Sequence, residues 1–198
     1  MIIDLITLSP SQIYHVMTQT LIPRPIAWVL SDNGNDSWNL APFSFFNGLA
    51  SDPPLLMLSV GLKDDGSPKD TRANILARRE FVVHIPPMAL LRAMNDSAAP
   101  LPAGESELTA QGLEVRPFPG FRLPRVAGCP VAYACRLHQV TAVGDQALIF
   151  GEIQSIHLSD RVASRDARGR LKVSAQALDP VARLGAGQYA GLGQVVTL

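Results

Sequence analysis

A phosphate site is the first chemistry that the residue types suggest, and it rests on Lys69-Asp70-Thr71, with Asn74 close behind. This segment joins an apolar run at 55–60, through a glycine-containing loop, to a stretch with helical character. A lysine ammonium, a threonine hydroxyl and the free N–H groups of a starting helix can all face one anion. The same residues also suit a solvated loop and an ordinary helix cap, because Asp and Thr are common at helix starts.

A second segment, Asn39–Asn47, places small and hydrogen-bonding residues among three phenylalanines. The aromatic side chains alone would suit a hydrophobic core. Ser44 and Asn47 would then need hydrogen-bond partners inside that core. A planar heterocycle would supply such partners along its edge while its faces pack on apolar side chains. The two segments together predict a bound mononucleotide.

Other kinds of chemical site are not indicated, so we expect no catalytic side chain and no metal. The four histidines form no His-x-x-x-His or Glu-x-x-His pair, and no nucleotide-loop or serine-hydrolase motif occurs. His138 is the histidine expected nearest to a site, although a structural hydrogen-bonding role is the simpler interpretation. Cys129 and Cys135 do not have Cys-x-x-Cys spacing and are expected to be reduced, buried thiols.

The composition narrows the classes of partner and the location. The chain has 198 residues, 47% of them hydrophobic and 17% charged, and its formal net charge is zero. A balanced charge without a basic face argues against nucleic acid and anionic membranes as partners. No segment approaches the ~20 apolar residues of a membrane span, and the N-terminus lacks the pattern of a signal peptide. We therefore expect a cytoplasmic protein with a single domain over residues 1–198.

Short apolar runs between scattered prolines and glycines predict six or seven strands and three short helices. Helices are expected at 11–18 (after Ser9 and Pro10), 71–79 (capped by Asp70 or Thr71) and 88–94. Strands are expected at 26–30, 37–41, 55–60, 80–85, 131–143 and 147–158. Pro42 is expected to end its strand, and 55–60 to be central and buried on both faces. Residues 97–124 are expected to cross the surface. Too few helical crossovers remain for a parallel sheet, so an antiparallel barrel is predicted.

Four segments in a fixed order resemble a known family. They are Pro23–Val29, Asn39–Asn47, Ser51–Pro54, and Lys69-Asp70-Thr71 with Asn74. This succession resembles the flavin reductase-like FMN-binding proteins of split-barrel fold, and the tail at 180–193 is similar to their longer members. The resemblance covers nearly the whole chain. It implies a mainly β, antiparallel Greek-key split barrel with a few short helices, and a homodimer with FMN near the subunit interface.

The resemblance also implies which residues bind FMN. Those expected beside the isoalloxazine ring or at the phosphate are Asn39, Ala41, Ser44, Phe45, Ser59, Lys69, Thr71 and Asn74. Arg24 would reach the phosphate or the ribityl chain, or would instead anchor the barrel mouth. Arg183 and Tyr189 match the family, but no role follows for either.

The activity that the resemblance implies is that of an FMN-dependent oxidoreductase. It would use NADH or NADPH as a transient co-substrate for hydride transfer to the flavin N5, with the cofactor supplying the chemistry. A partner monooxygenase would be one recipient of the reduced flavin. Three alternatives stay open, because one fold hosts several activities: a flavoredoxin-like FMN electron carrier, a non-catalytic flavin-binding module, and an oxidase of amines.

Overall fold

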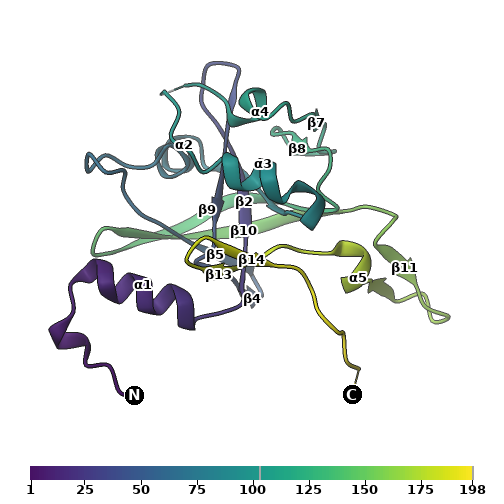
Figure 1. The fold of residues 1–198 in the computed structure, drawn as a ribbon. Helices are drawn as coiled ribbons and strands as arrows, with labels where there is room; N and C mark the ends of the chain where they lie inside the picture. Colours follow the sequence, from purple (N-terminus) through teal and green to yellow (C-terminus); the bar gives the residue numbers. More distant parts are fainter. Residues whose placement is uncertain (103, 198) are drawn as a thin grey trace.

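A curled, seven-stranded antiparallel sheet dominates the computed structural model, which describes residues 1–102 and 104–197 (Figure 1). The strand order is β3-β2-β6-β9-β10-β5-β4. The bounds are β2 Ala27–Asp32, β3 Trp38–Phe43, β4 Phe46–Ser51, β5 Pro54–Val60, β6 Glu80–Ile85, β9 Val131–Val143 and β10 Gln146–Leu158.

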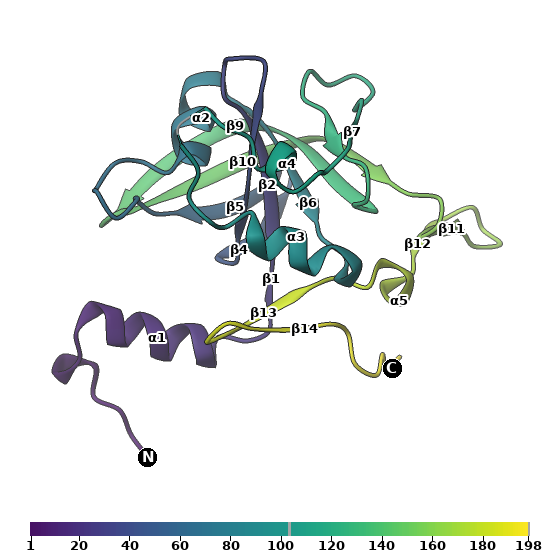
Figure 2. The same ribbon diagram turned by 45° about the horizontal axis from the view of Figure 1, so that its top comes forward.

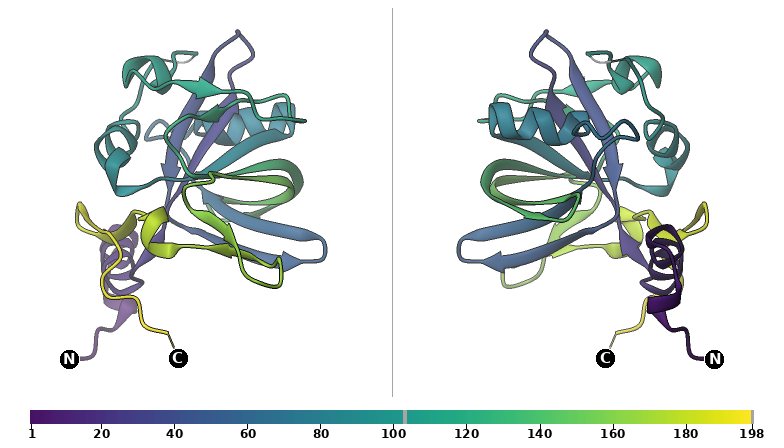
Figure 3. Two further views of the ribbon diagram at one scale, coloured as in Figure 1. Left: turned by 90° about the vertical axis from the view of Figure 1, so that its right-hand side faces the viewer. Right: turned by 90° about the vertical axis from the view of Figure 1, so that its left-hand side faces the viewer.

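The sheet closes because its two edge strands are consecutive in the chain. Only Ser44 and Phe45 separate the end of β3 from the start of β4. The two edges of the sheet must therefore meet at this bend, and β3 also contacts β5. Figure 3 shows the resulting barrel from two sides. The predicted antiparallel barrel is thus confirmed.

Short helices and small sheets surround the barrel. The helices are η1 Leu5–Thr7, α1 Pro10–Thr20, α2 Asp70–Arg78, η2 Met88–Leu90, α3 Leu91–Asp96, α4 Glu107–Ala110 and α5 Ala175–Leu178. The short strands are β1 Arg24–Pro25, β13 Ala182–Gly185 and β14 Gln188–Ala190 in one sheet, β7 Val115–Arg116 with β8 Arg125–Val126, and β11 Ala163–Arg165 with β12 Leu171–Val173. None of the helices in the described residues is both long and apolar enough to span a membrane.

Both faces of the sheet are buried around β2 and β6. Alternate residues such as Val29 and Phe81 pack with Ile75 of α2 in one core cluster. Their neighbours, including Trp28, pack in a second cluster with side chains of 97–124. That segment was expected to cross the surface, but it contributes buried apolar residues to this second core and contains α4, β7 and β8. The expectation fails because a few well-spaced apolar side chains suffice to cover a sheet face.

Helix α1 begins as predicted, with Ser9 as its cap. The Ser9 hydroxyl accepts from the Gln12 N–H, and the Gln12 side chain accepts from the Ser9 N–H at 2.8 Å. Pro10 occupies the first helical position, where its missing N–H costs nothing. The helix lies apart from the barrel, beside the β1-β13-β14 sheet (Figure 2). Gly185 permits this contact, because a Cβ there would lie 2.5 Å from the Thr18 carbonyl oxygen.

Three expectations about individual elements are corrected. Strand β5 lies second from the edge and alternates between buried and more exposed residues, so it is neither central nor buried on both faces. Strand β3 continues past Pro42, because an edge strand has one side on which no ladder hydrogen bond is lost. Helix α2 has Lys69 as its N-cap, and no side chain caps it. The predicted strand at 80–85 and the long β9–β10 hairpin are confirmed.

Candidate functional site

A cavity of about 520 Å³ lies between β3 and the start of α2. Its walls come from β3, from the loop between β5 and α2, from the segment after α3, and from α4. The lining residues are Asn39, Ala41, Pro42, Phe43, Leu62–Asp65, Lys69–Thr71, Ser97–Leu101 and Glu107. This volume lies within the range of about 300–1,000 Å³ that is usual for small-molecule sites.

The two segments that the sequence singled out meet at this cavity. Asn39 and Thr71 are both buried, and the Asn39 Nδ2 donates to the Thr71 Oγ1 at 2.8 Å. Asn39 also donates to the Ser31 Oγ at 3.4 Å. Because Thr71 belongs to the first turn of α2, this contact fixes the start of the helix against β3. Four of the predicted cofactor-binding residues line the cavity: Asn39, Ala41, Lys69 and Thr71.

The α2 end of the cavity has the features of an anion site. No side chain caps the first turn of α2, so its N–H groups remain available. Lys69 is exposed at the cavity and forms no ion pair with the residues that the structure describes, whereas Lys63 pairs with Asp70 at 2.8 Å. Arg72, in the first turn of α2, does not line the cavity, and its guanidinium donates to the Asp145 carbonyl at 3.3 Å. A phosphate at this end of the cavity would meet Lys69 and the N–H groups of α2 that no side chain caps.

Ser44, Phe45 and Ser59 lie outside the cavity lining. Ser44 and Phe45 form the half-buried bend between β3 and β4, and the Phe45 carbonyl accepts from the Ser59 N–H at 2.9 Å. The Ser59 hydroxyl donates to the Gln146 Oε1 at 3.1 Å. The assignment of these three residues to FMN stays a prediction.

Arg24 has the contacts of an anchor. Its buried guanidinium donates to the carbonyls of Thr18 and Leu21, the latter at 2.6 Å, at the end of α1. Its Nε donates to the Ser44 Oγ at 3.4 Å, and its charge lies 6.0 Å from the centre of the Phe45 ring. Arg24 thus ties α1 to the bend between β3 and β4. Of its two expected roles, these contacts favour anchoring.

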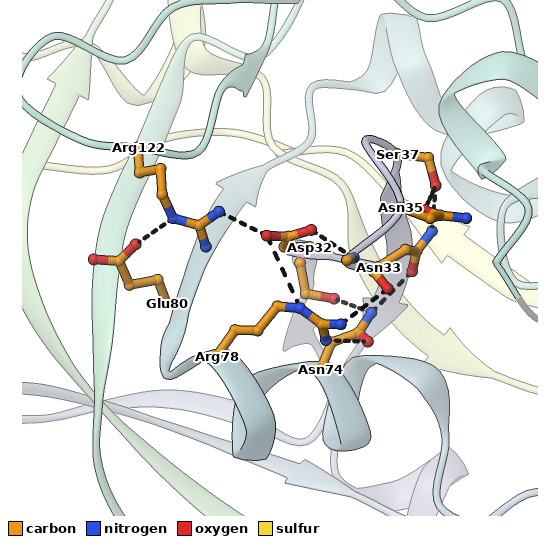
Figure 4. Close-up of polar contacts among 10 residues, drawn as sticks. Asp32, Asn33, Asn35, Ser37, Asn74, Arg78, Glu80 and Arg122 are labelled. Atoms are coloured by element: carbon orange, nitrogen blue, oxygen red, sulfur yellow. Dashed lines mark hydrogen bonds and ion pairs between the residues drawn. The ribbon is translucent and has the colours of Figure 1, made fainter.

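Asn74 lies behind the cavity, in a polar network that fixes the β2–β3 turn (Figure 4). Its Nδ2 donates to the Asn33 Oδ1 at 2.9 Å and to the Ser31 Oγ at 3.3 Å. The Asn74 side-chain Oδ1 accepts a hydrogen bond from Arg78, and Arg78 also donates to the backbone carbonyl of Asn33. Asn74 therefore positions α2, and through it Thr71, without lining the cavity.

Glu107 is a cavity residue that the sequence did not indicate. Only 8% of it is exposed, and its Oε2 accepts from the Leu40 N–H at 2.7 Å. Burial raises the pKa of this carboxyl above its ordinary value, and the nearby Asp70 acts in the same direction. Its sequence neighbours show no periodicity, so no local signal would have found it. Residues 62–65 also line the cavity, and no motif in the sequence had marked them.

The buried histidine is His84, and it lies away from the cavity. Its Nδ1 donates to the Trp28 carbonyl at 2.9 Å, and its Nε2 accepts from the Val126 N–H at 3.0 Å. Burial lowers its pKa to about 4, so it is neutral at pH 7. His138, expected nearest to a site, instead lies beside Glu152 at 3.5 Å and does not line the cavity. The described residues contain no His, Cys, Asp or Glu cluster that could hold a metal.

The cysteines and the C-terminal tail have structural settings. Cys129 and Cys135 are free and buried, as expected, and burial raises the pKa of both thiols. The Arg183 guanidinium lies 4.4 Å from the centre of the Tyr189 ring and donates to its hydroxyl. Tyr189 in turn donates to the Asn95 Oδ1 at 2.8 Å. The tail is thereby fastened to α3.

Residues 18–173 match the family model of the flavin reductase like domain. The chain belongs to this family. It is 38% identical to an uncharacterized protein of Deinococcus radiodurans, over 92% of this chain and 81% of that relative. The crystal structure of nitrilotriacetate monooxygenase component B from Bacillus cereus has 31% identity and a TM-score of 0.90, covering 100% of this chain and 98% of that one. The 2-nitrobenzoate 2-nitroreductase NbaA of Pseudomonas fluorescens has 29% identity and a TM-score of 0.88, covering 100% and 95%. The resemblance noted in the sequence, and the split-barrel fold it implied, are confirmed.

The lining of the cavity fits a flavin mononucleotide. Ala41, Pro42, Phe43 and Leu62 offer apolar surface, and the 98–101 segment adds more. Asn39 and Thr71 place hydrogen-bonding groups beside this surface, and the uncapped start of α2 with Lys69 can receive an anion. A flat ring with a polar edge and a phosphate needs these three features in one space.

Proposed function

We propose that this protein binds FMN and reduces flavin with NADH or NADPH. The general class of activity, that of a flavin-related oxidoreductase, follows from the family. The main support for FMN binding is the contact between Asn39 and Thr71 at the cavity. At the α2 end of this cavity, Lys69 and the first N–H groups of the helix are available to a phosphate. Hydride transfer needs a positioned cofactor and no charged catalytic side chain.

In this proposal the chain binds and orients the cofactor. Lys69 and the first N–H groups of α2 hold the phosphate, and Thr71 sets their position through Asn39. Asn39, Ala41 and Phe43 form the wall beside the ring. FMN supplies the capacity to accept a hydride at N5 when it is bound. The backbone of Ser44 and Phe45 and the hydroxyl of Ser59 remain proposed contacts.

Anaerobic mixing with each nicotinamide nucleotide tests the activity. The FMN-loaded protein should lose its flavin absorbance rapidly with NADH, with NADPH or with both. If FMN is bound but neither nucleotide bleaches it, the reductase is excluded, and an electron carrier or a flavin-binding module is left. If no FMN is bound at all, the whole proposal fails.

A second candidate is the reduction of a nitroaromatic compound by bound reduced flavin. Its support is the 29% identity to the nitroreductase NbaA over the whole chain. The likeness to monooxygenase component B instead supports transfer of reduced flavin to a partner monooxygenase. The two candidates differ in one measurement. The anaerobically reduced protein should be reoxidised by 2-nitrobenzoate in the first case and should release reduced flavin in the second.

We also propose that the protein is a homodimer. Tyr14 of helix α1 and Leu21, directly after the helix, are each more than half exposed, and edge strand β4 exposes Leu49 to 56%. Beyond the start of β4 all of its residues are exposed, so one edge of the sheet has no cover. Two-fold pairing is the commonest way to bury such surface. The cytoplasmic location and the single domain over residues 1–198 stay predictions.

A further inference from the structure

Glu107 has a position that structural need alone does not explain. It comes from α4, and its carboxyl lines the cavity with one oxygen fixed on the Leu40 N–H at 2.7 Å. Because β3 is an edge strand, this N–H points away from β2 and needs an acceptor. A neutral acceptor such as a glutamine carbonyl would satisfy the same N–H without placing a charge in a buried site.

The surroundings make a carboxylate unfavourable at this position. Burial and Asp70 both oppose ionisation of Glu107, while the Leu40 N–H and the N–H of Glu107 itself favour it. The other charged groups of the lining are Lys63, Asp64, Asp65 and Lys69. Lys63 is already paired with Asp70 at 2.8 Å. Glu107 has no cationic partner among the residues that the structure describes, and a buried acid of this kind at a cavity is a marker of function.

The second carboxyl oxygen is the part of Glu107 that is left for a ligand. Among the described residues, the donors that meet this carboxyl are the backbone N–H groups of Leu40 and of Glu107 itself. An ionised carboxyl only accepts hydrogen bonds, and it repels a phosphate. A ligand group that pairs with it must therefore be a neutral or cationic donor. In FMN the donors are the ribityl hydroxyls and the ring N3–H.

We propose that Glu107 is a specificity-determining residue, whose carboxyl accepts a hydrogen bond from a ribityl hydroxyl or from the ring N3–H of the flavin. This inference rests on the proposed function, since it concerns the same cavity. The other polar atoms along the flavin edge are hydrogen-bond acceptors, so Glu107 would recognise the part of the ligand that carries donors.

Glu107→Gln separates this role from the support of β3. The glutamine carbonyl keeps the acceptor for Leu40, while its NH₂ group replaces the oxygen that faces the ligand. Loss of a hydrogen bond to a charged group predicts about a 10- to 150-fold rise in the FMN dissociation constant. The unfolding temperature should not fall, because a buried charge is removed. Glu107→Ala should also raise the FMN dissociation constant, and it should lower the unfolding temperature because the Leu40 N–H loses its acceptor. Glu105→Gln, at an exposed position outside the cavity, is the matched control.

Fluorescence titration with FMN, N3-methyl-FMN and a ribityl-deoxygenated FMN identifies the donor. The analogue that lacks it should bind the native protein more weakly, and Glu107→Gln should not discriminate against that analogue. If Glu107→Gln keeps its fold and binds FMN as tightly as the native protein, the inference is overturned while the proposed function stands. If the native protein does not bind FMN, the proposed function fails and this inference fails with it.

Discussion

The Asn39 side chain donates a hydrogen bond to the Thr71 hydroxyl across 2.8 Å, and both residues are buried. One residue belongs to edge strand β3 and the other to the first turn of α2. The contact therefore connects the two walls of the cavity. Because it is shielded from water, loss of either partner leaves a buried polar group without its main hydrogen bond.

Thr71→Val tests how much this contact stabilises the fold. Valine keeps the shape of threonine but leaves the Asn39 Nδ2 with only the Ser31 Oγ, at 3.4 Å. The free energy of unfolding should fall by about 1–3 kcal/mol, as measured by urea denaturation. Thr109→Val, at an exposed position of α4, should change it by less than about 0.5 kcal/mol. Equal urea midpoints for the two variants would show that the contact does not stabilise the fold.

Lys69→Ala tests the phosphate end of the cavity. Removal of one charged hydrogen bond should raise the FMN dissociation constant by about 10- to 150-fold. The native protein should prefer FMN to riboflavin, and this preference should shrink in the variant. Lys172→Ala, on exposed strand β12, should leave both affinities unchanged. An unaltered dissociation constant in Lys69→Ala would remove Lys69 from the site.

Leu49→Lys tests the proposed subunit interface. The side chain is 56% exposed on edge strand β4, where a lysine costs nothing in a monomer but places a charge inside a β4-mediated dimer. Light scattering at low micromolar concentration should give a dimer mass for the native protein and a reduced mass for the variant. Leu171→Lys is the control, since Leu171 is 53% exposed on the hairpin that projects from the barrel. A native monomer with full flavin occupancy would contradict the dimer.

His84 predicts that stability falls as the solution becomes mildly acidic. Its pKa is about 4 in the fold, below the ordinary 6.5, so the unfolded chain binds more protons between these pH values. Stability is therefore fully present above pH 6.5 and is lost as pH falls toward 4, by about 3 kcal/mol from this group. Protonation would also remove the Nε2 acceptor of the Val126 N–H.

Urea denaturation between pH 4 and 7.5 measures this dependence. The raised pKa of Glu107 acts in the opposite direction, so the comparison that isolates His84 is with His84→Gln. That variant should be less stable at pH 7 but should depend less on pH, whereas exposed His15→Gln should behave as the native protein. A variant with the native slope would assign the pH dependence to other groups.

Local patterns in the sequence were enough to predict the elements that have strong apolar runs or clear turns. Strand β6 and the β9–β10 hairpin are of this kind. Strand β4 was missed, because most of its residues are exposed and carry no apolar pattern. The role of 97–124 was also missed, since its buried residues are isolated among prolines and glycines.

The candidate site was predictable where residue type and family order agree. Asn39, Ala41, Lys69 and Thr71 do line one cavity. Glu107 was not predictable, because its position depends on an edge strand 67 residues earlier in the chain. Asn74 lies in α2, the helix whose start lines the cavity, but its side chain points to Asn33 and not into the cavity.

The place of β5 between β4 and β10 has a consequence for the nascent chain. Strand β10, one of its two partners, follows roughly 100 residues later in the chain. At about 5–20 residues per second, a ribosome needs roughly 5–20 s to synthesise that stretch. During that interval β2 and β3 can pair, but the barrel that supports both walls of the cavity cannot close. Chains that stop before β10 should therefore be substrates for chaperones and proteases, and the cavity should become able to bind a ligand only after release of the finished polypeptide.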